Sequence, residues 1–548
     1  MTTKGGTLAE ELAFARKASG LVRGLSMTDA IAVGLMNQGI TPSIWTMITW
    51  GLGTYLTGNL LWASVISLVL VGFGFPLVWG ILSASMPRSG GEYIYNSRII
   101  HPIVGIAESF GNAFVMIFWV YVLAPWIADP GLVILAEYQG WTWLYDSATG
   151  AFFGGLSYEW GVFVVATIAN VLALLTMIFG VKIFATIQKS IMFIALGGAA
   201  VITGSIMISS KSAMQANWDR FAEQYGSLKY AEVVPAVSKA IGETVPTSST
   251  FYGTLGVMVA GSWLFAYAYF CVFVAGEVKR PDKTLIWANF IAILVPALLM
   301  IWTALSMYRV MPFDFISATA WIDNNGGIDG YTMPFLPSYM SLGYIAHSNW
   351  FVAFAASLSY MLFTFWYVAL SYLAFPRIIF AWGMDRMGPK WFTSINARWA
   401  SPVKNYILCF ILCQAAIALY SFWLGSYMQG LTVTGMEIVS VWGVTTVAAL
   451  LFPFMRRSKG IWDSSPFKTW RFAGVPMIVW GAIASLIYLS ILFYFLIFTE
   501  EMKDSNGQSW ILYGVVWVIG IVWYLFWAQR SKTVGVDVSM TYGELPPE

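Results

Sequence analysis

Long apolar stretches alternate with short polar connections over nearly the whole chain. An apolar run of about 20 residues is long enough for a helix to cross the hydrocarbon core of a bilayer. The runs are 27–50, 59–85, 103–128, 158–179, 182–208, 251–277, 284–308, 349–375, 404–424, 431–455, 474–498 and 509–529. The pattern therefore predicts an all-α membrane protein with 12 transmembrane helices.

The first apolar run is broken in its middle. It reads AIAVGLMNQGITPSIW, so Asn37, Gln38, Gly39, Thr41 and Pro42 interrupt what is normally continuous hydrocarbon. Backbone amides freed at bilayer depth have no water to bind, and such a break is tolerated only inside protein or beside a cavity. A second half-helix starting at Pro42 would direct its amides and positive dipole end to the break, which favours an anion. The alternative is a simple kink.

The sixth run has a weaker interruption, because Ala266 and Ala268 flank Tyr267 halfway along GSWLFAYAYFCVFVAGEVKRP. Small residues here also fit close helix packing. However, runs one to five and six to ten each begin with an interrupted segment, which is typical of an inverted repeat. We therefore expect a 5+5 inverted repeat with discontinuous helices 1 and 6, plus two C-terminal helices.

This interpretation divides the chain into six segments. They are a cytoplasmic N-terminus at 1–25, a first repeat at 26–208, an outer loop at 209–250, a second repeat at 251–456, two further spans at 457–529 and a cytoplasmic tail at 530–548. The outer loop has helix-like apolar spacing, which predicts an amphipathic helix on the outer face. Its apolar positions are Trp218, Phe221, Tyr225 and Leu228.

Composition and charge agree with this class and set the orientation. Hydrophobic residues make up 58% of the chain and charged residues only 10%, which excludes an ordinary soluble protein. With both termini in the cytoplasm, all but six of the 29 lysines and arginines lie on the inner side, as the positive-inside rule requires. The exceptions are Lys211, Arg220, Lys229, Lys239, Arg309 and Lys503. The basic residues are spread over short loops, which argues against nucleic acid as a partner.

The inventory of reactive residues argues against an enzyme. The histidines are His101 and His347 alone, the three cysteines lie in apolar stretches, and no zinc-protease, paired-cysteine or serine-nucleophile motif occurs. We therefore expect no catalytic residues, no metal and no other cofactor.

Four predicted cytoplasmic stretches resemble the APC superfamily of amino acid, polyamine and organocation permeases. PRSGGEYIYNSR at 87–98 is similar to that family's first inner loop, and AGEVKRPDKT at 275–284 to the end of its sixth helix. The stretch at 375–406 resembles the loop joining helices eight and nine, and RRSKGIWDSSPFK at 456–468 resembles the link from ten to eleven. The resemblance implies a permease that moves amino acids or related amines across the cell membrane by alternating access. The alternative is a permease-like membrane sensor or scaffold without transport.

The resemblance also implies a substrate site between helices one and six, unwound at their centres. The substrate carboxylate would meet amides near Gln38, Gly39 and Ile40, and the ammonium would meet carbonyls released on both helices. Those carbonyls belong to Ala32, Val33, Phe265 and Ala266. The expected substrate-binding residues are Val33, Asn37, Gln38, Gly39, Ile40, Phe265, Ala266, Tyr267 and Ala268.

Three of these positions depart from the family. Its usual small residues, spaced as GxxxGxG, align with Val33, Asn37 and Gly39. Asn37 has three possible roles. Its amide hydrogen-bonds the substrate carboxylate, or its side chain fills the pocket and changes the substrate class, or it merely satisfies the polar groups of the broken helix. Tyr267 stands where the family commonly has glycine, so it is either a gate or pocket wall with a hydroxyl, or an ordinary core tyrosine.

The coupling ion is open between a proton, a sodium ion and none. Ala195 aligns with a lysine that replaces sodium in some family members, and Lys189 is expected to snorkel or pair locally. Glu437 is a candidate because an ionisable group within a membrane span is functional by default. Thr364 and Ser371 offer oxygen ligands for sodium, although hydroxyls are also common between packed helices.

Charged residues in the four recognised stretches either form salt bridges that close the inner side or serve as topology signals and headgroup contacts. They are Arg88, Glu92, Arg98, Glu277, Lys279, Asp385 and Arg386.

Overall fold

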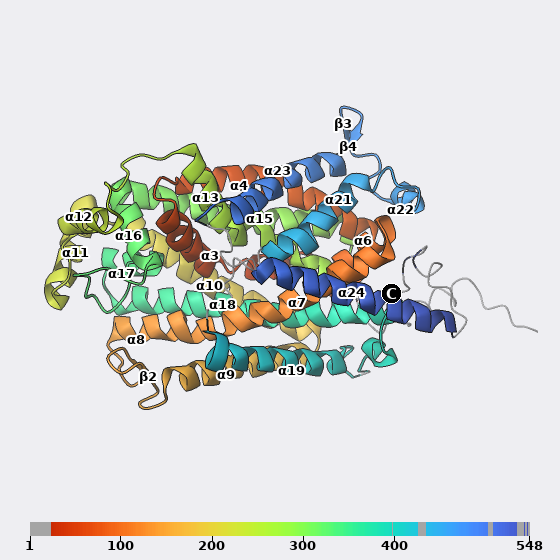
Figure 1. The fold of residues 1–548 in the computed structure, drawn as a ribbon, viewed down its shortest axis with the longest axis horizontal. Coiled ribbons are helices and arrows are strands. Elements are labelled where there is room, and N and C mark those ends of the chain that lie inside the picture. The colour runs from red at the N-terminus through yellow and green to blue at the C-terminus, as the bar shows by residue number, and fades with distance from the viewer. Residues whose placement is uncertain are drawn as a thin grey trace, which may run out of the picture.

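The computed structural model describes residues 23–396, 398–425, 435–501, 508–533, 542 and 545. Most of its helices run along the longest axis of the molecule (Figure 1). In the described residues, nine helices are long and apolar enough to cross a membrane, or up to ten if one bent pair is a single span. The chain is therefore an all-α, multi-span membrane protein.

Nine long apolar helices of the described residues overlap predicted spans, although the helices at the third and eighth spans continue to Gln139 and Met384, past the predicted ends at 128 and 375. They are α4 with η2 and α5 (Leu60–Ser85), α7 with η3 and α8 (Pro102–Gln139), α9 (Tyr158–Ile178), α10 (Val181–Ile208), α15 (Pro281–Val310), α18 (Trp350–Met384), α19 with η6 (Val403–Leu424), α23 (Met477–Phe498) and α24 (Gln508–Thr533). The predicted tenth span is a shorter apolar helix, Gly435–Leu451, which includes η8 (Ile438–Gly443) and α21 (Val444–Leu451). The predicted N-terminal segment up to residue 22 and most of the predicted tail lie outside the described residues.

The first predicted span is built from three pieces. The helix α2 (Met27–Asn37) ends at the break formed by Gln38 and Gly39, and α3 (Ile40–Thr46) then continues into the π-helix η1 (Met47–Leu52). Gly39 adopts a left-handed conformation with φ of 50°, which glycine tolerates best. The predicted break is confirmed. The second half-helix starts at Ile40 and not at the predicted Pro42, and Gly39 is its N-cap residue.

The sixth predicted span is bent and then tightens. An angle of 56° separates α13 (Phe251–Ala260) from the segment Ser262–Glu277, which comprises α14 (Ser262–Ala266) and the 3₁₀-helix η4 (Tyr267–Glu277). The change of helix type does occur at the predicted Tyr267, but the bend lies earlier, at Gly261. There the first span passes so close that an added Cβ would lie 2.7 Å from the sulfur of Met47.

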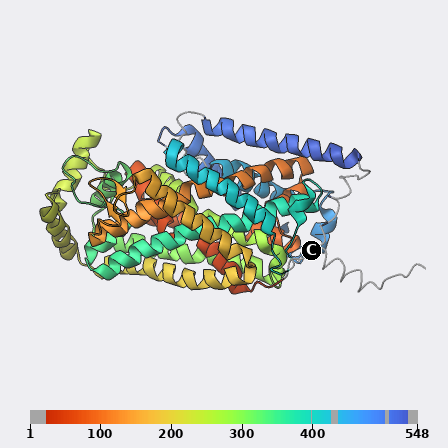
Figure 2. The ribbon, with the colours of Figure 1, turned by 90° about the horizontal axis from the view of Figure 1, so that it is seen from below.

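The two broken segments occupy the centre of the molecule. α2 packs against η4 and is surrounded by α10, α15 and α18. Gly34 permits this contact, because a Cβ there would lie 2.7 Å from the carbonyl oxygen of Ala268. Every residue of η4 is buried. By contrast, α24 runs along the outside of the bundle (Figure 2).

The two ends of the bundle differ. The short helices α11 (Lys211–Tyr225), α12 (Tyr230–Ile241), α16 (Phe313–Asn324) and α17 (Tyr339–Ala346) gather at one end, called the α11 end below (Figure 1). The helices α6 (Glu92–Ile99) and α22 (Lys459–Ser464) lie at the opposite α6 end. Two small hairpins complete the fold, β1 (Tyr145–Asp146) with β2 (Ala151–Phe152) and β3 (Arg471–Phe472) with β4 (Val475–Pro476).

The predicted amphipathic helix of the outer loop is two helices, α11 and α12. Trp218 and Phe221 are buried as its apolar face requires, whereas Tyr225 is exposed at the helix end. Gly226 separates the two helices in a left-handed conformation, which ends α11.

Candidate functional site

Side-chain amides join the two broken segments at the level of the break. Asn37 Nδ2 donates to the carbonyl oxygen of Tyr267 at 2.9 Å, and Gln38 Nε2 donates to the carbonyl oxygen of Phe265 at 3.4 Å. Both amide side chains are fully buried. This contact between the break and the residues 265–268 is called the junction below. The side-chain amide of Asn37 thus satisfies a backbone carbonyl of the other broken segment and not one of its own helix.

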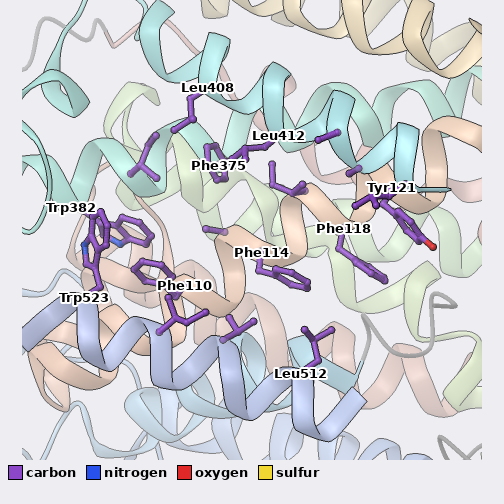
Figure 3. A pocket seen from close by; sticks show the side chains of 18 of the residues that line it. Phe110, Phe114, Phe118, Tyr121, Phe375, Trp382, Leu408, Leu412, Leu512 and Trp523 are labelled. Carbon is purple, nitrogen blue, oxygen red and sulfur yellow. The ribbon is translucent and has the colours of Figure 1, made fainter. Parts of the chain in front are cut away.

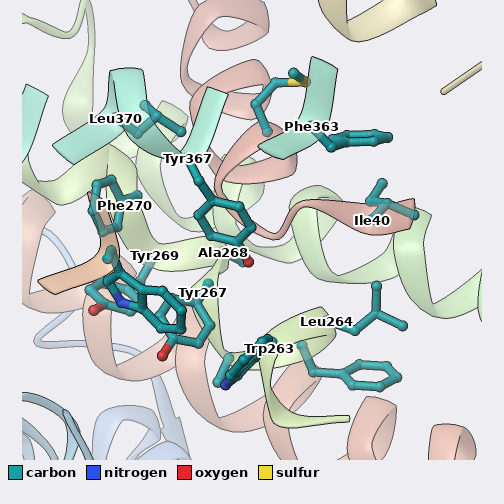
Figure 4. Packing of buried hydrophobic residues seen from close by; sticks show 14 of the residues in the cluster. Ile40, Trp263, Leu264, Tyr267, Ala268, Tyr269, Phe270, Phe363, Tyr367 and Leu370 are labelled. Atoms are coloured by element: carbon teal, nitrogen blue, oxygen red, sulfur yellow. The ribbon is translucent and has the colours of Figure 1, made fainter. Parts of the chain in front are cut away.

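All predicted site residues are buried on the two broken segments. Val33 and Asn37 lie on α2, Gln38 and Gly39 in the break, Ile40 at the start of α3, Phe265 and Ala266 at the end of α14, and Tyr267 and Ala268 at the start of η4. Figure 4 shows Ile40, Tyr267 and Ala268 around the ring of Tyr367, which comes from α18.

Protein groups occupy part of the predicted substrate contacts in this conformation. Gln38 takes the carbonyl of Phe265, and Gln188 Nε2 of α10 donates to the carbonyl of Ala32 at 3.0 Å. The backbone amides of Gln38 and Gly39 both point to the carbonyl of Met36. The first turn of α3 has no side-chain cap, so its amides and positive dipole end remain favourable for an anion.

An aromatic cage surrounds the junction. Tyr367 covers Gly39 so closely that an added Cβ would lie 2.1 Å from its Cε2 atom. Trp119 of α7 stacks on Tyr367 with 5.9 Å between ring centroids and meets Tyr267 edge-on at 5.5 Å. Trp263 contacts Trp119 edge-on at 5.1 Å. Sequence reasoning missed Trp119, Trp263 and Tyr367, because aromatic residues make up 17% of the chain and none of these three follows a local motif.

Towards the α11 end, tryptophans and one carboxylate close the bundle over the junction. Trp45 and Trp50 of the first span contact Trp126, with centroids 5.5 Å and 5.8 Å apart. Asp323 of α16 accepts hydrogen bonds from Trp45 Nε1 at 3.0 Å and from the Thr49 hydroxyl. Burial raises the pKa of Asp323 to about 6, although the hydrogen bonds from Thr49 and Trp45 oppose that rise. α16 is thereby fastened to the second half of the first span.

Towards the α6 end, buried ion pairs hold the helices together. Arg98 of α6 pairs with Asp385 at 2.6 Å, so for these two residues the expected salt bridge is present. Glu277 pairs with Arg377 at 2.7 Å. Sequence reasoning missed Arg377 as a partner. The signal was present, because Arg377 is a charged residue directly after the eighth apolar run.

The chain before α2 seals the same end. Leu25 forms a parallel bridge with Val278, and the amides of Gly24 and Leu25 donate to the carbonyl of Glu277 at 2.9 Å and 3.0 Å. The start of the first span and the end of the sixth are therefore fixed to each other by the backbone.

Three of the polar residues considered for ion coupling, Lys189, Thr364 and Ser371, are bound to other groups of the protein. Lys189 pairs with Asp29 at 2.8 Å, as expected for a local pair. Thr364 and Ser371 donate to carbonyls of their own helix at 2.7 Å and 3.3 Å. In the part of the chain that the structure describes, no group of three or more histidine, cysteine or acidic side chains could hold a metal ion.

Two further links cross the bundle near the junction. Ser359 of α18 donates to the carbonyl of Ala195 at 2.7 Å, and its hydroxyl lies 2.6 Å from that of Thr41. Glu437 accepts a hydrogen bond from the hydroxyl of Tyr267. The tenth apolar helix therefore touches the junction through Glu437, and the fifth and eighth spans hold α3.

A cavity of about 590 Å³ lies away from the junction, between α7, α18, α19 and α24. Figure 3 shows Phe110, Phe114, Phe375 and Leu412 among its apolar lining. This lining is predominantly apolar, whereas broken backbone and buried amides meet at the junction.

A family model described as amino acid permease matches residues 25–522, which include both broken segments. No curated protein matches the chain.

Proposed function

Since the chain belongs to the amino acid permease family and is thus a membrane transporter rather than an enzyme, we propose that it moves an amino acid or a related amine across the cell membrane by alternating access. Its substrate binds at the junction.

The observation that carries this proposal is the meeting of two broken helices at one level inside the bundle. Interrupted helices expose backbone donors and acceptors that an unbroken helix uses internally. The start of α3 receives the substrate carboxylate, and the carbonyls near Val33 and Ala266 receive the ammonium. In the absence of substrate, the side chains of Asn37 and Gln38 donate to the carbonyls of Tyr267 and Phe265. They release these carbonyls when the substrate enters.

The side-chain walls of the site come from the aromatic cage. Tyr367 covers Gly39, and Trp119 and Tyr267 pack against the Tyr367 ring. We expect these residues to select the substrate by the size and polarity of its side chain, since backbone groups recognise only the part common to all amino acids.

The full architecture is proposed as 12 membrane-spanning helices, with the first ten in a 5+5 inverted repeat and both termini in the cytoplasm. The family match and the distribution of basic residues support this arrangement. The α11 end then faces outwards and the α6 end faces the cytoplasm.

Closure at both ends supports alternating access. Asp323 fastens the outer side, while Arg98–Asp385, Arg377–Glu277 and the Leu25–Val278 bridge fasten the inner side. Opening one set of contacts while the other stays closed exposes the junction to one side at a time.

Purified protein in liposomes tests the proposal. Preloaded and empty vesicles are supplied with a panel of labelled amino acids and amines under imposed sodium or proton gradients, and we expect saturable uptake of at least one compound. Binding of a compound without uptake would favour the sensor or scaffold alternative. Neither binding nor uptake of any compound would refute a site for amino acids.

A further inference from the structure

Within the part of the chain that the structure describes, Glu437 is a buried carboxylate without a cationic partner. Its side chain is fully buried beside η8, one oxygen accepts a hydrogen bond from the Tyr267 hydroxyl, and the other has no hydrogen-bond partner. The indole N–H of Trp119 faces the carboxyl without reaching hydrogen-bond geometry. The ion pairs found among the described residues involve other carboxylates: Asp29, Glu223, Glu277, Asp385 and Asp463.

A carboxylate in this position holds a proton. An ion without a partner inside apolar protein costs several kcal/mol, and the group takes up a proton to avoid that cost. Glu92 is a further acidic side chain that acts on Glu437, and two carboxyls of like charge do not ionise together in such surroundings. From the packed elements, Tyr267 of η4 and Trp119 of α7 are the polar side chains that face the carboxyl.

Tyr267 connects Glu437 to the junction. Its hydroxyl reaches Glu437, whereas its carbonyl oxygen accepts the hydrogen bond from Asn37. The ring is fixed between Trp119 and Trp442, with centroids 5.5 Å and 5.1 Å away. A change at Glu437 that moves the Tyr267 ring therefore moves the backbone group that holds the first span.

Two further buried acidic side chains, Glu92 and Glu108, lie towards the α6 end. Glu92 accepts hydrogen bonds from Trp79 Nε1 at 2.9 Å and Asn112 Nδ2 at 3.3 Å. Neither oxygen of Glu108 has a hydrogen-bond partner, although both are buried. Asn96 faces Glu108, but its amide is used by Thr445 at 3.0 Å. Two neighbouring carboxyls of like charge cannot both ionise here.

We propose that Glu437 is the proton-binding residue of the transport cycle and that Tyr267 couples its protonation to the junction. This inference rests on the proposed transport function and specifies its coupling ion. In the closed conformation a proton from the medium sits on a carboxylate oxygen of Glu437. When the junction opens to water, the carboxylate releases that proton, and Glu92 with Glu108 provides a second protonatable group towards the α6 end. No covalent bond other than O–H changes.

The first measurement uses substrate-free protein and does not depend on transport. Infrared difference spectra in H2O and D2O detect protonated carboxyl groups, and we expect Glu437→Gln to remove one such band at neutral pH. Glu223→Gln is the matched control, since Glu223 lies exposed on α11. Tyr267→Phe keeps the carboxyl but removes its hydrogen bond, so the band should shift and remain. An unchanged band in Glu437→Gln would overturn the proposal.

The second measurement is uptake in liposomes with and without an inward proton gradient. Wild-type protein should be stimulated by the gradient, and a protonophore should abolish the stimulation. Glu437→Gln should lose the stimulation completely while still exchanging substrate between the two sides, and Glu223→Gln should keep it. Full stimulation in Glu437→Gln would contradict the proposal. If no compound is carried at all, the transport function fails, while the infrared result still decides whether Glu437 holds a proton.

Discussion

Gly39 is the residue on which the junction depends most directly. It holds the left-handed conformation between α2 and α3, and the Tyr367 ring lies where a side chain would begin. A Cβ at this position adds backbone strain of about 1–2 kcal/mol and also displaces Tyr367. Glycine therefore has two separate reasons to occur here, one in the backbone and one in the packing.

We expect Gly39→Ala to weaken substrate binding at least about tenfold, because displacing Tyr367 disturbs the cage beside the carboxylate site. Binding titrations with the transported compound measure the effect, and thermal unfolding shows whether the fold survives. Gly204→Ala is the matched control, since a Cβ on Gly204 of α10 would meet open space. Unchanged affinity in Gly39→Ala would place the substrate elsewhere.

Among the elements, we expect α16 to act as a latch whose strength depends on pH, because burial raises the pKa of its Asp323. Asp323 has a pKa of about 6 when α16 is docked, compared with 3.8 when the side chain is free in water. The docked form therefore binds the proton more tightly than the undocked form. The free energy of docking is most favourable below pH 3.8, where the carboxyl is protonated in both forms, and it weakens as pH rises through about 6. The difference corresponds to roughly 3 kcal/mol.

Hydrogen exchange of residues 313–324 tests this latch. After correction for the intrinsic effect of pH on exchange, we expect α16 to become less protected as pH rises through about 6. Asp323→Asn cannot ionise, so its protection should be independent of pH over the same range. A wild-type profile as flat as that of Asp323→Asn would show that Asp323 does not control docking.

For the whole molecule, the proposed alternating access means that the two ends open in turn. The α6 end is closed by a backbone bridge between Leu25 and Val278, which lie before α2 and after η4. Residues paired across a bridge are close enough for a disulfide between substituted cysteines. The native cysteines, Cys271, Cys409 and Cys413, are free and buried, so they interfere little.

We expect the double variant Leu25→Cys with Val278→Cys to form a disulfide under oxidising conditions and to lose uptake. Reduction should restore uptake, because only the opening of this end is blocked. Each single variant serves as a control under the same oxidant. Full uptake by the cross-linked protein would mean that the α6 end need not separate at this bridge.

Local composition was enough to establish the class of the protein and the position of the break in its first predicted span. Hydropathy depends on local composition, so the apolar runs identify the spans. The group from Asn37 to Pro42 cannot continue an apolar helix, so it identifies the break between α2 and α3. The nine expected site residues are likewise all buried on the two broken segments, although their role in binding stays a prediction.

Only the tertiary structure decided what fills the junction and how its ends close. The bend at Gly261 depends on the approach of Met47, the cover of Gly39 depends on Tyr367, and Glu277 finds Arg377 a hundred residues away. Such contacts depend on which helix faces pack together, and an almost uniformly apolar, aromatic-rich span gives no local pattern that distinguishes one face from another. Local chemistry therefore specifies where a membrane helix breaks, whereas packing decides which side chains meet at the break.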